Sequence, residues 1–287
     1  MNWLDTVVQG MLLGGLFALF AMGLAVMYGV MRLINIAHGD FVVLGAYLIM
    51  SVALTSHLSV FAAAGVVIVL FAALGYALQR ALLDRALAGD LLAPLVVTYG
   101  LSVVVENALQ QTYSADSRSL QLGGIETASV HLGPIAAGVV PLLVFGVALG
   151  VAAALEFLFN ATPLGMAFRA TSDDRATARL MGVRDVQLYG YAAAISFGVT
   201  ALASFFMGVK YTFTPTLGPS FLLYAFEAIV IGGMGSFWGT FAGALILGVA
   251  QAVGFALDPG WGILAGHLVF LAVLVVRPQG LFPKVLA

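Results

Sequence analysis

Cysteine is absent from this 287-residue chain, and charged side chains are scarce. Without cysteine the chain forms no disulfide and no thiolate metal site. Asp, Glu, Lys and Arg make up 8% of the residues, whereas a soluble domain carries about 25%. So few charges cannot solvate a folded surface, and 62% of the residues are hydrophobic. We therefore expect a polytopic membrane protein surrounded by lipid.

Other features that the sequence lacks exclude several classes of function. The net charge is −2 and no basic tail or patch is present, so nucleic acid is not an expected partner. The four histidines lie far apart in the sequence, which argues against a metal site. The phosphate-loop pattern G-x-x-x-x-G-K-[ST] is missing, and neither lysine follows a glycine. If ATP powers this protein, a partner subunit must bind the nucleotide and its magnesium.

The apolar residues fall into segments long enough to cross a bilayer, which takes about 20 residues. The first two are separated only by a short polar motif, and the seventh and eighth only by the residues GSFWG, so we expect eight or nine spans. The fold class is then an all-α transmembrane bundle, with residues 1–287 forming one domain. The segments are 7–31, 38–55, 59–79, 91–112, 134–159, 187–209, 221–236, 238–257 and 261–277.

Basic residues predict the orientation, because Lys and Arg collect in cytoplasmic loops. With nine spans and the C-terminus inside, nine of the eleven basic residues lie on the inner side. Only Arg118 and Lys210 fall outside. The pattern predicts an outer N-terminus and an inner C-terminus.

The longest predicted inner loop, residues 160–186, contains signals for a short helix over 172–181. Thr171 and Asp174 resemble a capping box, and Asp173 and Asp174 would lie in the first turn, where acids suit the helix dipole. Gly182 stands where a helix-ending glycine belongs. Such a helix cannot span the membrane. It is either a solvated surface helix or a docking helix for a cytoplasmic partner, and the docking residues would then be Asp173, Asp174, Arg175, Ala176, Arg179, Leu180 and Gly182.

A polar motif interrupts the first two apolar segments, with Arg32, Asn35, His38, Gly39 and Asp40 close together. Polar groups inside a membrane usually face the bundle interior or a water-filled path. One interpretation is a break between two half-spans, in which the polar side chains satisfy free backbone groups and Gly39 permits the turn. The other is a cytoplasmic turn in which Asp40 caps the next helix. Both place the motif beside the translocation pathway.

A second candidate part of the pathway is the stretch EAIVIGGMGSFWG. Glu227 lies in an apolar segment, and Gly232, Gly233 and Gly235 would allow close approach of a helix or a substrate. Either these residues gate the pathway or they form an ordinary turn between two helices.

Four motifs together resemble the LivH-type permease of branched-chain amino-acid ABC transporters. They are RLINIAHGDFVVLGAY, TPLGMAFRAT, ARLMGV and EAIVIGGMGSFWGTFAGALILG. The run ATARLMG is similar to the coupling motif E-A-A-x-x-x-G of ABC importer permeases, with Ala176 in place of the glutamate. The resemblance implies a pore of two permease subunits, two cytoplasmic ATPases, an extracytoplasmic binding protein, and a bacterial or archaeal cytoplasmic membrane. It implies no cofactor in this chain.

The resemblance favours import of leucine, isoleucine, valine or related amino acids by alternating access. Import of urea or short amides is an alternative, since similar permeases serve these solutes. An ion-coupled secondary transporter is another, with Asp40, Glu106 and Glu227 as a proton or sodium relay. A pair of Ser236 and His267 is the only hint of an intramembrane enzyme, because no G-x-S-x-G or H-E-x-x-H motif is present.

Overall fold

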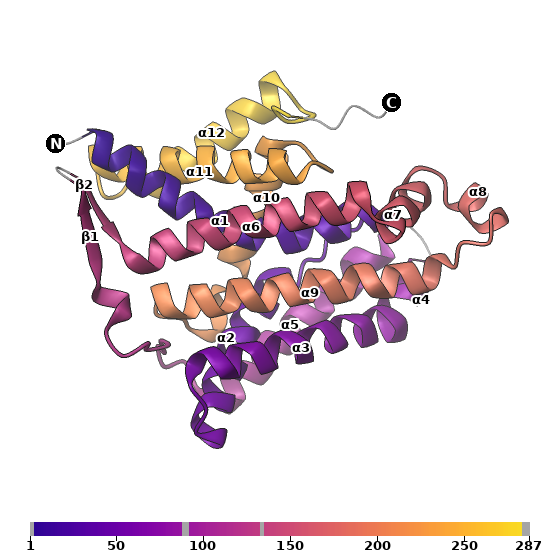
Figure 1. Ribbon diagram of the computed structural model, residues 1–287, viewed down its shortest axis with the longest axis horizontal. Helices are drawn as coiled ribbons and strands as arrows, with labels where there is room; N and C mark the ends of the chain where they lie inside the picture. Colours follow the sequence, from indigo (N-terminus) through magenta and orange to yellow (C-terminus); the bar gives the residue numbers. More distant parts are fainter. Residues whose placement is uncertain (1–2, 88–91, 133–134, 283–287) are drawn as a thin grey trace.

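The computed structural model describes residues 3–87, 92–132 and 135–282 and shows a bundle of long helices (Figure 1). The helices α4, α7 and α8 lie at one end of the bundle, and a β-hairpin lies at the other (Figure 1). We call these the α8 end and the hairpin end. The long helices are α1 (Trp3–Met31), α2 (His38–Ser56), α3 (Val60–Leu78), α5 (Ala93–Tyr113), α6 (Val139–Ala161), α9 (Asp185–Lys210), α10 (Gly218–Gly232), α11 (Phe237–Leu257) and α12 (Gly262–Val276).

Shorter elements connect the long helices. After α3 the chain makes a π-helical turn, η1 (Gln79–Leu83), and the short α4 (Asp84–Ala86). The antiparallel hairpin consists of β1 (Ser129–Leu132) and β2 (Ile135–Gly138), with Val130 opposite Ala137. The hairpin lies in the segment that joins α5 to α6.

Seven helical segments of the described residues are long and apolar enough to cross a membrane. They include α1, α2, α3, α6, α9, α10 with the turn before it, and α11. The helix α12 is apolar but shorter, and α5 carries Glu106, Asn107 and two glutamines. The structure therefore supports a helical multi-pass bundle, and the number of eight to nine spans stays a prediction.

The helix α1 is the centre of the bundle. Of its most apolar 18-residue window, 89% is buried, because α6, α9, α10 and α11 all pack around it. Glycines allow the closest of these contacts: a Cβ placed on Gly14 would lie 2.7 Å from the Ala244 carbonyl oxygen of α11. This close approach of backbones through small residues is typical of helix packing in membranes.

The polar motif after α1 turns back into the bundle. The chain reverses at Arg32, whose φ is +52°, and residues 32–37 are not helical. The His38 Nε2 atom then lies 2.8 Å from the carbonyl oxygen of Phe20, which is about 16 Å back along α1 at 1.5 Å per residue. The expected turn at Gly39 is wrong, since Gly39 lies in the first turn of α2.

A second helix also begins inside the bundle. After α9 the chain pairs with the loop between α5 and α6 through Arg118 and Phe213, and α10 then starts at Gly218. A Cβ placed on Gly39 would lie 1.9 Å from the Gly218 carbonyl oxygen. The first turns of α2 and α10 therefore touch in the interior of the protein.

The loop at residues 160–186 holds two helices instead of the one expected over 172–181. The helix α7 (Pro163–Asp173) begins after Thr162, whose hydroxyl accepts a hydrogen bond from Gly165 N, and α8 (Arg175–Leu180) follows at once. The capping box was wrong: the Thr171 hydroxyl donates to the Ala167 carbonyl within α7. Asp174 breaks the two helices apart with an extended conformation.

Candidate functional site

Asp174 holds the start of α8. Its Oδ1 atom accepts hydrogen bonds from the backbone N–H groups of Ala176 and Thr177, at 2.9 and 3.1 Å. The Thr177 hydroxyl donates to the other carboxylate oxygen at 2.5 Å. These hydrogen bonds, that of the Thr177 hydroxyl first, lower the pKa of Asp174. Asp174 is thus the N-cap of a helix that begins one residue later.

The other end of α8 is closed by Gly182, as the sequence predicts. Gly182 has a φ of +85°, which glycine adopts without strain. Its N–H donates to the Arg179 carbonyl, and the N–H of Val183 donates to that of Ala178. This pair of bonds is a Schellman motif, so both ends of the short helix are fixed by the chain itself.

Loss of the Asp174 cap is expected to fray α8. Asp174→Ala removes both carboxylate acceptors. Acid has the same effect, because folding lowers the pKa of Asp174. The stabilisation by the cap is therefore complete above the unfolded pKa of about 3.9 and is lost as the pH falls through the folded pKa. Hydrogen–deuterium exchange of the Ala176 and Thr177 amides should rise at least tenfold at pH 7. Unchanged exchange at both amides would contradict the role of the cap.

The predicted arginine stripe faces the protein's own α9. Arg175 Nε and Arg179 Nη2 lie 2.5 and 2.8 Å from Asp185 Oδ2, and Asp185 is buried at the first residue of α9. The hydrogen bond to Asp185 and the charge of that carboxylate raise the pKa of Arg179. No helical spacing links Asp185 to the arginines, so sequence reasoning missed it. Large apolar side chains are exposed at the end of α8, on Leu180 and on the next residue, Met181, with exposed fractions of 87% and 80%.

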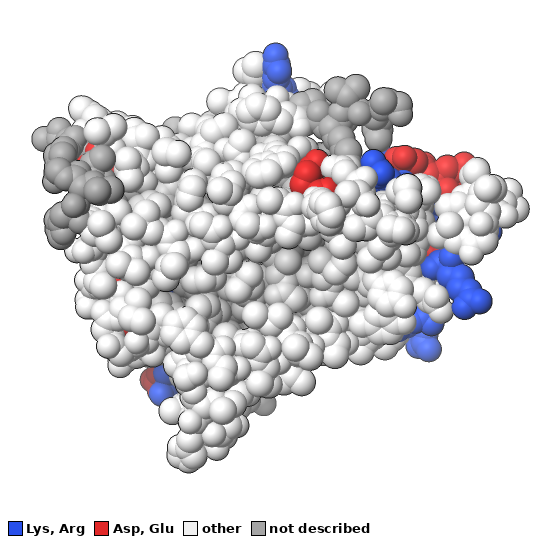
Figure 2. Space-filling model, in the orientation of Figure 1, with Lys and Arg blue, Asp and Glu red and all other residues white. Residues whose placement is uncertain are grey.

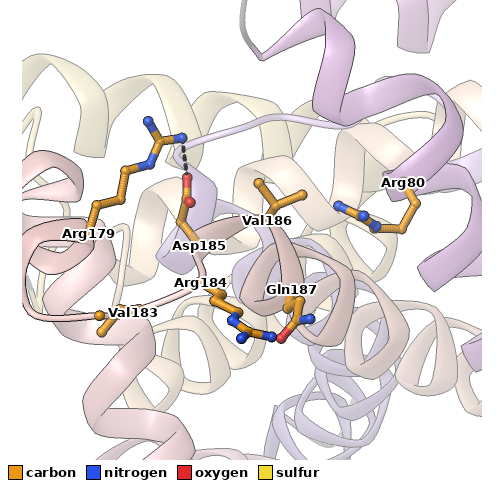
Figure 3. A pocket seen from close by; sticks show the side chains of 8 residues that line it. Arg80, Arg179, Val183, Arg184, Asp185, Val186 and Gln187 are labelled. Atoms are coloured by element: carbon orange, nitrogen blue, oxygen red, sulfur yellow. Dashed lines mark hydrogen bonds and ion pairs between the residues drawn. The ribbon is translucent and has the colours of Figure 1, made fainter.

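A hollow of about 570 Å³ lies beside α8 (Figure 3). Arg80 on η1 borders one side, and Arg179 with residues 182–187 borders the other. Figure 3 shows the Arg179–Asp185 pair at the rim, with Arg80 across from Val186. Charged side chains gather at this end of the face drawn in Figure 2, whereas the middle of that face carries few. The α8 end is therefore a polar surface that combines basic groups with exposed apolar side chains such as Leu180 and Met181.

We call the place where the first turns of α2 and α10 touch the interior junction. It contains most of the first polar motif. The Asn35 side chain accepts a hydrogen bond from Ala37 N at 3.1 Å. Asn35, His38 and Asp40 are each about 1% exposed. Ala37, not Asp40, is the N-cap residue of α2, so the motif is a buried break and not a surface turn. Polar side chains thus satisfy backbone groups at Ala37 and Phe20.

Glu227 lies apart from this junction, on the part of α10 that faces α12. Its Oε1 atom is 2.5 Å from His267 Nδ1, and its Oε2 atom is buried with no hydrogen-bond partner. Ser236 instead caps α11 by accepting from Gly239 N. Because His267 pairs with Glu227 and Ser236 caps a helix, the structure gives no support to a Ser236–His267 enzyme.

The glycines of the second motif shape the turn between α10 and α11. Gly233 and Gly235 have φ values of +107° and +95°. A Cβ placed on Gly232 would lie 2.0 Å from the Gly239 carbonyl oxygen. Backbone conformation therefore favours glycine at positions 233 and 235, and close packing favours it at position 232. In the part of the chain that the structure describes, no group of His, Asp and Glu residues could hold a metal ion.

The fold and these features define a helical membrane protein of the permease class. Residues 6–276 match the family model described as "Branched-chain amino acid transport system / permease component", and the chain belongs to this family. Over 99% of its length the chain is 28% identical to the high-affinity branched-chain amino acid transport system permease protein BraD of Pseudomonas aeruginosa, 96% of which is covered.

Two further relatives and one solved structure are also similar to this chain. The permease protein LivH of Escherichia coli strain K12 is 27% identical over 98% of this chain and 96% of its own. LivM of Salmonella typhimurium is 26% identical over 93% of this chain and 68% of its own. The solved structure of PsaBC from Streptococcus pneumoniae matches with a TM-score of 0.52 and 13% identity, over 97% of this chain and 93% of that one, which supports the fold alone.

Proposed function

We propose that this chain is the permease subunit of an ATP-driven importer for branched-chain or related hydrophobic amino acids. The relatives that it matches along nearly their whole length are named as permeases for these amino acids. The observation of the structure that supports the proposal best is α8, a short helix capped at both ends that presents Leu180 and Met181 outside the bundle. Exposed apolar side chains of this kind suit a protein partner.

The partners follow from this assignment. Two cytoplasmic ABC ATPases, which bind ATP and magnesium, dock on the loop at 160–186. An extracytoplasmic binding protein delivers the amino acid at the hairpin end. A second permease subunit, either a copy of this chain or a paralogue, completes the pore, and the similarity to LivM fits a paralogue. The chain lies in the inner membrane of a bacterium or archaeon with its N-terminus outside, as its basic loops favour.

We assign the pathway to the helices that begin inside the bundle. ATP binding closes the ATPase pair, α8 transmits the movement to α9 through Asp185, and the interior junction opens to one side and then the other. The proposed pathway and gate residues are Asn35, His38, Gly39, Asp40, Glu227, Gly232, Gly233 and Gly235.

Purification from the native membrane in mild detergent tests this function. We expect two ABC ATPases and a second multispan chain to copurify, and the reconstituted complex to take up leucine only with ATP and the binding protein. Recovery of the chain alone, together with uptake that follows a proton gradient, would instead identify an ion-coupled transporter. Uptake of urea or a short amide without leucine would refute the proposed substrate.

A further inference from the structure

The N-terminus of α10 meets a buried carboxylate. The first N–H groups of a helix have no partner within the helix, and together they attract negative charge. The helix α10 has 15 residues and begins at Gly218. A Cβ placed on Gly218 would lie 1.9 Å from Asp40 Oδ1. The Asp40 carboxylate is thus aimed at the first turn of α10, from the first turn of α2.

Asp40 lacks the partners that a buried carboxylate needs. Its exposed fraction is 1%, and its Oδ1 atom has no hydrogen-bond partner. The Ser102 hydroxyl on α5 is a hydrogen-bond partner of the carboxylate, and Glu106 follows one turn further along the same helix. None of the ion pairs among the described residues includes Asp40 or Glu106. A negative charge without a cation inside a bundle is costly, so this place favours a cationic group.

A row of polar side chains leads from Asp40 along α5. Ser102, Glu106 and Gln110 follow at intervals of four residues and share one face of the helix. The Gln110 side chain donates to Glu106 at 3.0 Å. Asn107 and Gln110 are exposed in this chain, on a helix too polar to be counted among the membrane-spanning candidates. This row gives a zwitterion a polar route between the hairpin end and the junction.

We propose that Asp40 receives the ammonium group of the transported amino acid, while the N-terminus of α10 receives its carboxylate. The inference rests on the proposed function and names the groups that recognise the substrate. A helix N-terminus inside a bundle binds anionic groups, and the unpartnered carboxylate beside it complements the ammonium. In the conformation described, Asp40 Oδ1 packs against Gly218 in the first turn of α10 and accepts no hydrogen bond there. The arriving ammonium draws this carboxylate aside and leaves the N-terminus for that of the substrate.

The proposal explains how the transporter discriminates between an amino acid and a neutral solute. Urea and short amides carry neither an ammonium nor a carboxylate, so neither can release Asp40 from α10. The apolar side chain of the substrate adds nothing to this recognition, which suits a carrier of several hydrophobic amino acids. Asp40 is therefore a specificity-determining residue of the proposed transport.

Asp40→Asn tests the inference, because it keeps the shape of the side chain and removes its charge. The complete transporter, with its ATPases, second permease and binding protein, is reconstituted in liposomes, and ATP-driven uptake of radiolabelled leucine is measured. We expect the initial rate to fall at least tenfold, and leucine-dependent ATP hydrolysis to fall with it. The thermal midpoint of the complex should not fall, because the substitution removes a buried charge that has no cation partner. Glu156→Gln, a change of the same kind on α6, should leave uptake unaltered.

Two results would overturn the inference. One is uptake by the Asp40→Asn complex that falls less than tenfold. The other is a loss of uptake that comes with a lower thermal midpoint, which would make Asp40 a structural counter-charge for α10. These failures differ from failure of the proposed function, in which the unaltered complex would carry no amino acid at all.

Discussion

Leu180→Asp combined with Met181→Asp is expected to release the ATPase subunits from the complex. Both side chains are at least 80% exposed, and neither has a role in holding α8, whose ends are fixed by Asp174 and Gly182. Apolar anchors of this kind dominate the binding energy of an interface, and a charge in their place would be buried without a partner. We expect ATPase binding to weaken at least a hundredfold, which corresponds to about 2.8 kcal/mol.

The measurement is the amount of ATPase that copurifies with the doubly substituted chain, together with its affinity for the purified permease. Ile125→Asp is the matched control, because Ile125 is also an exposed apolar residue but lies in the loop at the hairpin end. That variant should retain the ATPases. Normal ATPase recovery with Asp at both 180 and 181 would exclude α8 as the docking helix.

The arginines of the same loop have a different role from the one that their spacing suggests. The spacing of Arg175 and Arg179 suggests a basic surface that a partner could bind, but both guanidinium groups form ion pairs with Asp185. Replacing them by Ala would leave the buried Asp185 without cations and would free α8 from α9. Such a variant would weaken ATPase docking by displacing α8, not by removing contacts with the ATPase. Substitution of Arg175 and Arg179 is therefore a weaker test of docking than substitution of Leu180 and Met181.

The helices of this fold could be predicted because lipid demands long apolar segments. The expected segment 238–257 differs by one residue from α11, and the helix end at Gly182 is confirmed by its left-handed conformation. These features depend on composition and local conformation. The expected segment 134–159 begins outside the described residues, and Ile135–Gly138 form β2 before α6 starts at Val139.

The features that sequence reasoning missed depend on contacts between distant parts of the chain. Nothing local shows that α10 begins beside α2, since Gly218 only follows a short 3₁₀ turn and precedes Pro219. The reversal at Arg32 was not foreseen either, because a positive φ is uncommon in residues other than glycine. The sequence places the helix cap at Thr171, with Asp174 as its capping-box partner, whereas the N-cap of α8 is Asp174 itself. Whether the predicted pathway residues touch the substrate stays a prediction.

The helix α9 joins the two ends of the proposed mechanism. It begins at Asp185, which holds α8, and it packs on α1 and α2 further along. The Ser196 hydroxyl donates to the Gly23 carbonyl of α1 at 2.6 Å, and a Cβ placed on Gly45 of α2 would lie 2.3 Å from the Ser204 hydroxyl. A shift of α9 would therefore displace α2, the helix that carries Asp40. Packed helices of this kind move as rigid bodies between discrete arrangements.

Gly39→Ala is expected to separate the first turns of α2 and α10 and to destabilise the protein. The added Cβ would lie 1.9 Å from the Gly218 carbonyl oxygen and 2.8 Å from Leu222 N. Both are backbone atoms, so relief requires movement of a whole helix instead of a side-chain rotation. Overpacking costs about 1–3 kcal/mol in well-packed cores, and we expect the upper part of this range. The thermal midpoint of the purified complex and the yield of folded chain are the measurements.

Gly198→Ala is the control that makes this result specific. Gly198 also lies within a long helix, α9, but a Cβ placed there meets no atom within 4 Å. Alanine in a helix is favoured over glycine by about 1 kcal/mol, so the midpoint should stay the same or rise. Equal midpoints for Gly39→Ala and Gly198→Ala would show that α2 and α10 do not meet as described. The contact on which recognition by Asp40 depends would then be absent, whatever the fate of the docking helix.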